Sequence, residues 1–143
     1  GVLGLDLQRA ADAISNSVLS EMRMQHRTAR SGALIIDDSY NANPASMTAA
    51  LHALSVTKAS RRIAVLGVMA ELSEPEQDHS QISELAQKLG IEVLALGTDL
   101  YGVQSRTIDE IATMLSATEN TAAILVKGSR VAQLEKLVSL LVG

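Results

Sequence analysis

Residues 63–96 read IAVLGVMAELSEPEQDHSQISELAQKLGIEVLAL, and this stretch decides the fold class. It opens with the aliphatic run Ile63–Gly67 and closes with a second run, Ile91–Leu96. Continuous runs of this length are typical of strands that are buried on both faces of a parallel sheet. The spacing between the runs is that of a helix with one apolar stripe, at Ile82, Leu85, Ala86 and Leu89. The stretch therefore predicts one strand–helix–strand unit.

The same alternation runs through most of the remaining sequence. Two further aliphatic runs, Ala33–Ile36 and Ala122–Val126, have the composition of buried strands. Helical spacing recurs at Met47, Ala50, Leu51 and Leu54, at Ile108, Ile111, Ala112 and Leu115, and at Val131, Leu134, Val138 and Leu141. Strands that alternate with helices imply right-handed crossovers between parallel strands. The sequence therefore predicts an α/β fold with a doubly wound, mostly parallel sheet and helices on both faces.

Capping residues fall at the ends of the predicted helices. Asn43 and Pro44 form an N-cap and first-position pair, and Ser129 is placed to cap the last helix. Gly90 stands where a residue in the left-handed conformation would end a helix. Before the first strand, the polar connector Ser15–Ser31 follows one more helical stripe, at Leu7, Ala10, Ala11 and Ile14. We expect that leading helix to be the end of a preceding domain.

Composition excludes several classes of function. The 143 residues suit one domain, and 12 basic against 16 acidic residues give a net charge of −4, which argues against a nucleic-acid platform. Aromatic residues make up 1%, so bases have little to stack on and the core must be aliphatic. The absence of cysteine excludes disulfides and thiolate sites, and fits a reducing compartment. We expect no membrane span, which needs about 20 apolar residues, and no signal peptide.

Two polar segments directly follow predicted strands, where open parallel sheets bind ligands. The first, residues 37–44 (DDSYNANP), could bind ribose hydroxyls, a metal-bridged phosphate or a polar substrate, or could simply be a capped turn. The second, residues 127–130 (KGSR), joins two cations, a glycine and a capping hydroxyl at a helix start. Free N–H groups and the helix dipole make such a place an anion site, and the alternative is a cap with surface cations. The Walker spacing of a P-loop is absent.

A third polar segment, residues 67–72, runs into an acidic stretch and His79. Glu71 or His79 could act in acid–base chemistry, although a solvated carboxylate and a structural histidine are the commoner explanations. His26 and His52 have no partners at metal-ligand spacing, so we predict no metal site in this chain. Neither a GxGxxG dinucleotide motif after a strand nor a GxSxG nucleophile elbow is present.

Three strings in order, LIIDDSYNANPASMTAAL, AVLGVMAELSE with the later His79, and ILVKGSR with the later Glu135, resemble the C-terminal domain of the Mur ligases. The likeness covers roughly residues 20–143 and is strongest to the branch that adds D-alanyl-D-alanine. Residues 21–25 (EMRMQ) resemble the arginine-bearing linker into this domain. The resemblance implies that residues 1–20 are the terminal helix of a central ATPase domain and that residues 21–143 are a Rossmann-like C-terminal domain.

The resemblance also implies an activity for the full-length protein. Such ligases use ATP and Mg²⁺ to convert the terminal carboxylate of a UDP-N-acetylmuramoyl-tripeptide into an acyl phosphate, which the amine of D-alanyl-D-alanine attacks. It implies that Arg23 and Asp38 bind nucleotide and that five residues bind substrate, namely Asn41, Asn43, Lys127, Ser129 and Arg130. The P-loop and the metal ligands belong to the N-terminal and central domains of these cytoplasmic enzymes, so this chain alone should hold no catalytic residue or metal and be inactive.

Two departures from the family pattern stand out, and two alternative functions stay open. Gln25 replaces the acid that usually follows the linker arginine, and Gly97–Arg106 is shorter than the usual connection, so a strand or helix there is lost or compressed. One alternative is a related ATP-dependent amino-acid ligase, of another Mur or the folylpolyglutamate type. The other is a non-enzymatic α/β module of receiver-like kind, with Asp37, Asp38 and Lys127 in its pocket, although no acceptor aspartate follows a central strand.

Overall fold

The computed structural model describes residues 25–38, 42–69, 72–128 and 134–142. Within them the strands are β1 (Gln25–Thr28), β2 (Leu34–Asp38), β3 (Arg61–Gly67), β4 (Glu92–Leu96), β5 (Ser105–Arg106) and β6 (Ala122–Lys127). The helices are α2 (Pro44–Ser55), α3 (Pro75–Lys88), α4 (Ile108–Leu115) and α5 (Leu134–Val142).

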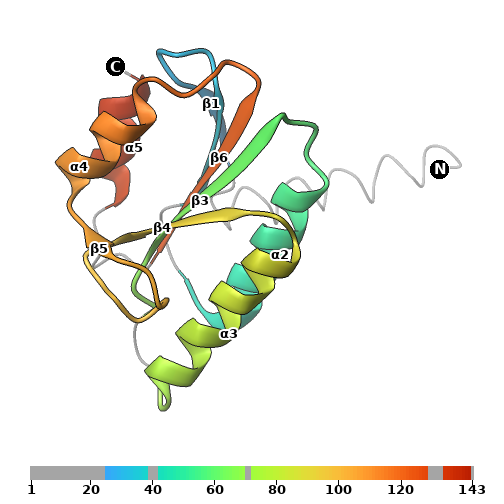
Figure 1. The fold of residues 1–143 in the computed structure, drawn as a ribbon, viewed down its shortest axis with the longest axis vertical. Coiled ribbons are helices and arrows are strands. Elements are labelled where there is room, and N and C mark those ends of the chain that lie inside the picture. The colour runs from blue at the N-terminus through green and yellow to red at the C-terminus, as the bar shows by residue number, and fades with distance from the viewer. Residues whose placement is uncertain (1–24, 39–41, 70–71, 129–133, 143) are drawn as a thin grey trace, which may run out of the picture.

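The described strands form one six-stranded sheet in the order β1-β2-β6-β3-β4-β5 (Figure 1). β1 runs antiparallel to β2, and every other neighbouring pair is parallel. β6 lies at the centre, and all six of its residues are buried. This arrangement confirms the predicted doubly wound, mostly parallel sheet, because each continuous aliphatic run occupies a strand that is covered on both faces.

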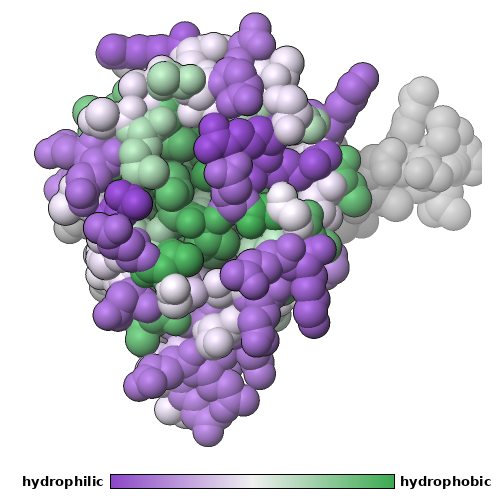
Figure 2. Space-filling model, in the orientation of Figure 1, coloured by the Kyte–Doolittle hydropathy of each residue, from purple (hydrophilic) through white to green (hydrophobic). Residues whose placement is uncertain are grey.

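Two helices cover each face of the sheet, as the apolar stripes predict. On one face, α2 and α3 pack on side chains that include Ile36, Ala64 and Leu66. On the other face, α4 and α5 pack on Ile35 and Val65. These residues are the chain neighbours of the first set, and successive strand residues point to opposite faces of the sheet. In the view of Figure 2, the visible apolar residues lie between the α2–α3 pair and the α4–α5 pair, and hydrophilic residues surround them. No described helix is both long and apolar enough to cross a membrane.

Local signals in the sequence fix the ends of two helices. Asn43 Oδ1 accepts a hydrogen bond from the Ser46 amide at 2.8 Å, and Ser46 Oγ accepts one from the Asn43 amide at 3.1 Å. This capping box, with Pro44 in the first turn, begins α2 as predicted. After α3, Gly90 has φ +74°, the left-handed conformation that favours glycine and ends the helix.

The prediction missed one strand and left another undecided. β1 lies inside Ser15–Ser31, which was predicted to be an irregular connector, because this strand at the sheet edge exposes His26, Arg27 and Thr28 and so shows no apolar pattern. In the short Gly97–Arg106 segment a two-residue strand, β5, remains, and the structure assigns no helix between β4 and β5. The expected leading helix and the Ser129 cap lie outside the described residues.

Candidate functional site

The first two polar segments begin side by side at the carboxyl edge of the sheet. β2 and β6 are parallel neighbours, and Asp38 stands opposite Lys127 in their register. Lys127 Nζ donates a hydrogen bond to Asp38 Oδ2 at 2.6 Å. The two side chains are only 2% and 1% exposed, so this is a buried ion pair. The polar segments 37–44 and 127–130 therefore leave the sheet next to each other.

Burial makes the Asp38 carboxyl unusual. Desolvation raises its pKa above the ordinary value of 3.8, the hydrogen bond and charge of Lys127 oppose that rise, and the neighbouring Asp37 adds to it. Asp38 Oδ1 is buried and has no hydrogen-bond partner in the described part of the chain. A buried carboxylate oxygen without a donor is costly, so this oxygen is an acceptor that a ligand hydroxyl or amide would satisfy.

The third polar segment begins at the same edge, and a glycine brings it there. β3 lies beside β6, so Gly67 at the end of β3 is next to Gly128 just after β6. A Cβ on Gly128 would lie 2.9 Å from Gly67 Cα and 2.5 Å from a Leu134 methyl group. Only glycine fits at this close approach.

Two buried side chains then hold the backbone that follows β3. Tyr101 donates its hydroxyl proton to the Gly67 carbonyl at 2.7 Å, and the Met69 amide donates to His79 Nε2 at 2.9 Å. His79 Nδ1 lies 2.5 Å from the Pro75 carbonyl. Because the amide can only donate and the carbonyl can only accept, His79 is neutral with its proton on Nδ1. This fully buried ring has no nitrogen left for acid–base chemistry, so its role is structural.

The chain also enters the sheet at this edge. β1 runs antiparallel to β2 and places its first residue, Gln25, opposite Asp37. Arg27 strengthens the attachment, because its Nε lies 3.2 Å from Asp37 Oδ2. The missed strand β1 thus brings Gln25, the last residue of the predicted linker, to the end of β2, and no apolar pattern in the sequence could have shown it.

The structure describes three of the seven predicted site residues, Asp38, Asn43 and Lys127. Lys127, which the resemblance implies binds substrate, pairs its ammonium group with Asp38. Asn43 is exposed, and its side-chain oxygen is used in the α2 cap. The remaining predicted residues, Arg23, Asn41, Ser129 and Arg130, lie outside the described residues, as does Glu71. The described residues contain no group of three or more acids and histidines that could hold a metal ion.

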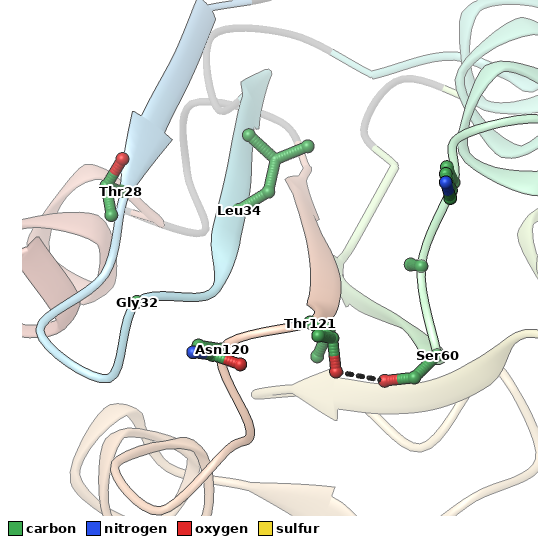
Figure 3. A pocket seen from close by; sticks show the side chains of 9 residues that line it. Thr28, Gly32, Leu34, Ser60, Asn120 and Thr121 are labelled. Atoms are coloured by element: carbon green, nitrogen blue, oxygen red, sulfur yellow. Dashed lines mark hydrogen bonds between the residues drawn. The ribbon is translucent and has the colours of Figure 1, made fainter.

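A cavity of about 540 Å³ lies elsewhere, at the amino ends of the strands (Figure 3). It is lined by the start of β2, the turn before β3 and the turn before β6, where Ser60 and Thr121 share a hydroxyl hydrogen bond of 2.6 Å. Of the predicted site residues that the structure describes, Asp38, Asn43 and Lys127, none lines it. It is therefore separate from the candidate site, which occupies the opposite edge of the sheet.

The geometry defines a class, an α/β domain that gathers polar loops where its central parallel strands end. Comparison with known proteins gives the family. The family model described as Mur ligase, glutamate ligase domain, matches residues 22–142, so the chain belongs to the Mur ligase family. This result confirms the resemblance on which sequence analysis relied, and it agrees with the observed fold.

Curated relatives carry a more specific name. Over 118 residues the chain is 41% identical to the UDP-N-acetylmuramoyl-tripeptide--D-alanyl-D-alanine ligase of Escherichia coli, which covers 73% of this chain and 26% of that protein. The protein of the same name from Mycobacterium tuberculosis is 41% identical over 100 residues, which are 65% of this chain and 20% of that protein. The chain thus spans about a quarter or less of these relatives.

Solved structures agree on the fold. The crystal structure of MurF ligase from Thermotoga maritima in complex with ADP superimposes with a TM-score of 0.69 at 26% identity, over 83% of this chain and 30% of that one. A ligase structure from Acinetobacter baumannii gives a TM-score of 0.67 at 29% identity, over 82% of this chain and 28% of that one. The six-stranded α/β domain seen here is therefore the fold of a Mur ligase C-terminal domain.

Proposed function

We propose that this chain is the C-terminal domain of a cytoplasmic ATP-dependent ligase that adds D-alanyl-D-alanine to a UDP-N-acetylmuramoyl-tripeptide. One observation carries the proposal: Asp38 and Lys127, which lie within two of the family-like strings, meet in a buried pair at one edge of the sheet. The 41% identity to ligases of that name favours this substrate over those of other Mur or folylpolyglutamate-type ligases. Family membership also disfavours a receiver-like module.

The proposed reaction forms a peptide bond in two steps. The γ-phosphoryl group of ATP passes to the terminal carboxylate of the tripeptide, which gives an acyl phosphate and ADP. The D-alanyl-D-alanine amine then attacks the acyl carbon, inorganic phosphate leaves, and the amine loses a proton. Mg²⁺ and most of the ATP contacts belong to the other domains in this proposal. The C-terminal domain positions the amine and excludes water, which would otherwise hydrolyse the acyl phosphate.

The site geometry supports a nucleotide role for the end of β2. Asp38 Oδ1 is an unsatisfied acceptor that suits a ribose hydroxyl. Arg23 precedes Gln25 by two residues, a span of at most about 7 Å of extended chain. Since Gln25 stands opposite Asp37, a guanidinium on Arg23 has the reach to meet the phosphates of a nucleotide whose ribose is at Asp38. A cation there would offset the negative charge that develops during phosphoryl transfer.

We propose that the loops after β2 and β6 bind the dipeptide substrate. Asn41, Ser129 and Arg130 extend the two turns that start at Asp38 and Lys127, and they supply the amide, hydroxyl and cation that a dipeptide carboxylate needs. For Lys127 we propose an indirect part. Because its ammonium group already pairs with Asp38, we propose that it acts on the substrate through that carboxylate and not as a direct ligand.

Phosphate release by the full-length protein tests the proposal. With ATP, Mg²⁺ and the tripeptide precursor, release should depend on D-alanyl-D-alanine and should stay at background with D-glutamate. Asp38→Asn should raise the KM for ATP, whereas the control Glu84→Gln, an exposed acid on α3, should leave it unchanged. Equal turnover with another amine would refute the substrate assignment, and an unchanged KM in Asp38→Asn would refute the nucleotide role.

The isolated 143-residue chain offers a second test. It should release no phosphate, but an ATP analogue should shift NMR resonances near Asp38, and D-alanyl-D-alanine should shift those near Gly128. Shifts confined to the cavity at the amino ends of the strands would contradict the site.

A further inference from the structure

Tyr101 and His79 lie outside the predicted site, yet both act on one short piece of backbone. Tyr101 comes from the segment between β4 and β5, and His79 comes from α3. They contact each other edge to face, with ring centroids 4.8 Å apart and an interplanar angle of 66°. Both are buried, at 2% and 0% exposure. Such a pair is rigid, because each ring fills a packed space and meets its polar partner at the same time.

The backbone that they hold is Gly67–Met69, the start of the loop after β3. Tyr101 binds the Gly67 carbonyl and His79 binds the Met69 amide, so one hydrogen bond fixes each end of this tripeptide. On the third side, Gly67 lies against Gly128 with no room for a side chain. The segment therefore cannot shift without breaking a buried hydrogen bond or moving the residue that follows Lys127.

We propose that Tyr101 and His79 are positioning residues that fix the backbone at Gly67–Met69 beside the site of the incoming amine. This inference rests on the proposed function. The nucleotide is proposed at the end of β2, beside the entry of the chain, and β3 ends at the same edge, two strands further along the sheet. The backbone at Gly67–Met69 therefore lies beyond the proposed nucleotide position along this edge, and we place the incoming amine there. Tyr101 and His79 set the geometry of the amine site through Gly67–Met69.

Variants that delete one hydrogen bond each can test this role in the full-length ligase. Tyr101→Phe removes the bond to Gly67 and keeps the ring. His79→Phe removes the acceptor for Met69, whereas His79→Gln can offer an amide oxygen close to where Nε2 stood. The matched control is Thr118→Val, which deletes another buried hydroxyl, bonded to the Leu115 carbonyl at 2.6 Å beyond the end of α4.

We expect Tyr101→Phe and His79→Phe to lower kcat/KM for D-alanyl-D-alanine by about 5- to 100-fold, the range that a displacement of up to 1 Å produces. The KM for ATP should change less than twofold. His79→Gln should recover most of the loss, and Thr118→Val should leave both constants near wild type. Urea unfolding of each variant separates lost stability from lost positioning.

The outcomes distinguish the two levels of the proposal. If the wild-type protein does not use D-alanyl-D-alanine, the proposed function fails. If the wild type is active but Tyr101→Phe and His79→Phe behave like Thr118→Val, the inference fails alone. A change in the KM for ATP equal to that for the dipeptide would also overturn it, because the loop would then not belong to the amine site. If one phenylalanine variant does not fold, the other decides: it must lower kcat/KM for D-alanyl-D-alanine at least fivefold relative to Thr118→Val, or the inference fails.

Discussion

Replacement of Lys127 by methionine should strongly destabilise the domain at neutral pH. The methionine side chain is shorter than lysine by about one atom and keeps much of its packing, but it removes the cation that faces Asp38 at 2.6 Å. Breaking a buried pair by removing one partner generally costs about 3–5 kcal/mol, because the remaining charge stays buried without compensation. Asp38 sets an upper limit on that cost, since it can take up a proton instead.

The limit follows from the ordinary pKa of the carboxyl, 3.8. Keeping Asp38 protonated at pH 7 costs about 1.4 kcal/mol for each pH unit above that value, or about 4.4 kcal/mol in all. In the variant, folded Asp38 is neutral and unfolded Asp38 is ionised. Its stability should therefore fall as pH rises, and the loss relative to wild type should be smaller at pH 5 than at pH 7.

Urea unfolding of four proteins measures these values: wild type, Lys127→Met, Asp38→Asn and the double variant. Each single variant removes one partner of the buried pair, whereas the double variant removes both, so it should recover to within about 2 kcal/mol of wild type. A loss below about 1 kcal/mol in Lys127→Met at pH 7 would refute the reasoning. So would a double variant whose loss equals the sum of the two single losses, since the residues would then not be coupled.

Three further perturbations test other features. Gly128→Ala should cost about 1–3 kcal/mol of unfolding free energy, because its Cβ meets Gly67 Cα at 2.9 Å, and thermal unfolding that matches wild type would contradict the close approach. Asn43→Ala should cost about 1 kcal/mol by removing the α2 cap, whereas Asn43→Asp should retain stability. Arg61 lowers the pKa of Glu92 through an exposed hydrogen bond, so Glu92→Gln should cost under about 1 kcal/mol at pH 7. That contribution is present above the ordinary Glu pKa of 4.5 and is lost as pH falls further, so the two proteins should converge in acid-unfolding measurements.

Sequence patterns determined the central fold because burial leaves a direct trace in composition. β6 is buried along its whole length and reads as a continuous aliphatic run, and the stripe of α2 faces the sheet as its spacing predicts. β1 leaves no such trace. Its side chains are polar and its stability comes from backbone pairing with β2, so only the three-dimensional structure shows it.

The candidate site was predictable in its location but not in its contacts. Parallel strands that end at one edge place Asp38 near Lys127, yet the sequence cannot say whether that lysine meets a ligand or a neighbouring carboxylate. The contact between Tyr101 and Gly67 joins residues 34 positions apart, and nothing near either residue indicates the other. Such pairings depend on how the loops fold back on the sheet, which local spacing does not encode.

In the proposed ligase a further domain precedes this one in the chain. Because β1 places Gln25 opposite Asp37, a rotation of this domain about that connection would pivot beside the candidate site. Asp38 lies close to this pivot, whereas the amino ends of the parallel strands lie a full strand length away from it. A rigid swing would carry the far cavity through a wide arc and leave the Asp38–Lys127 pair almost where it was.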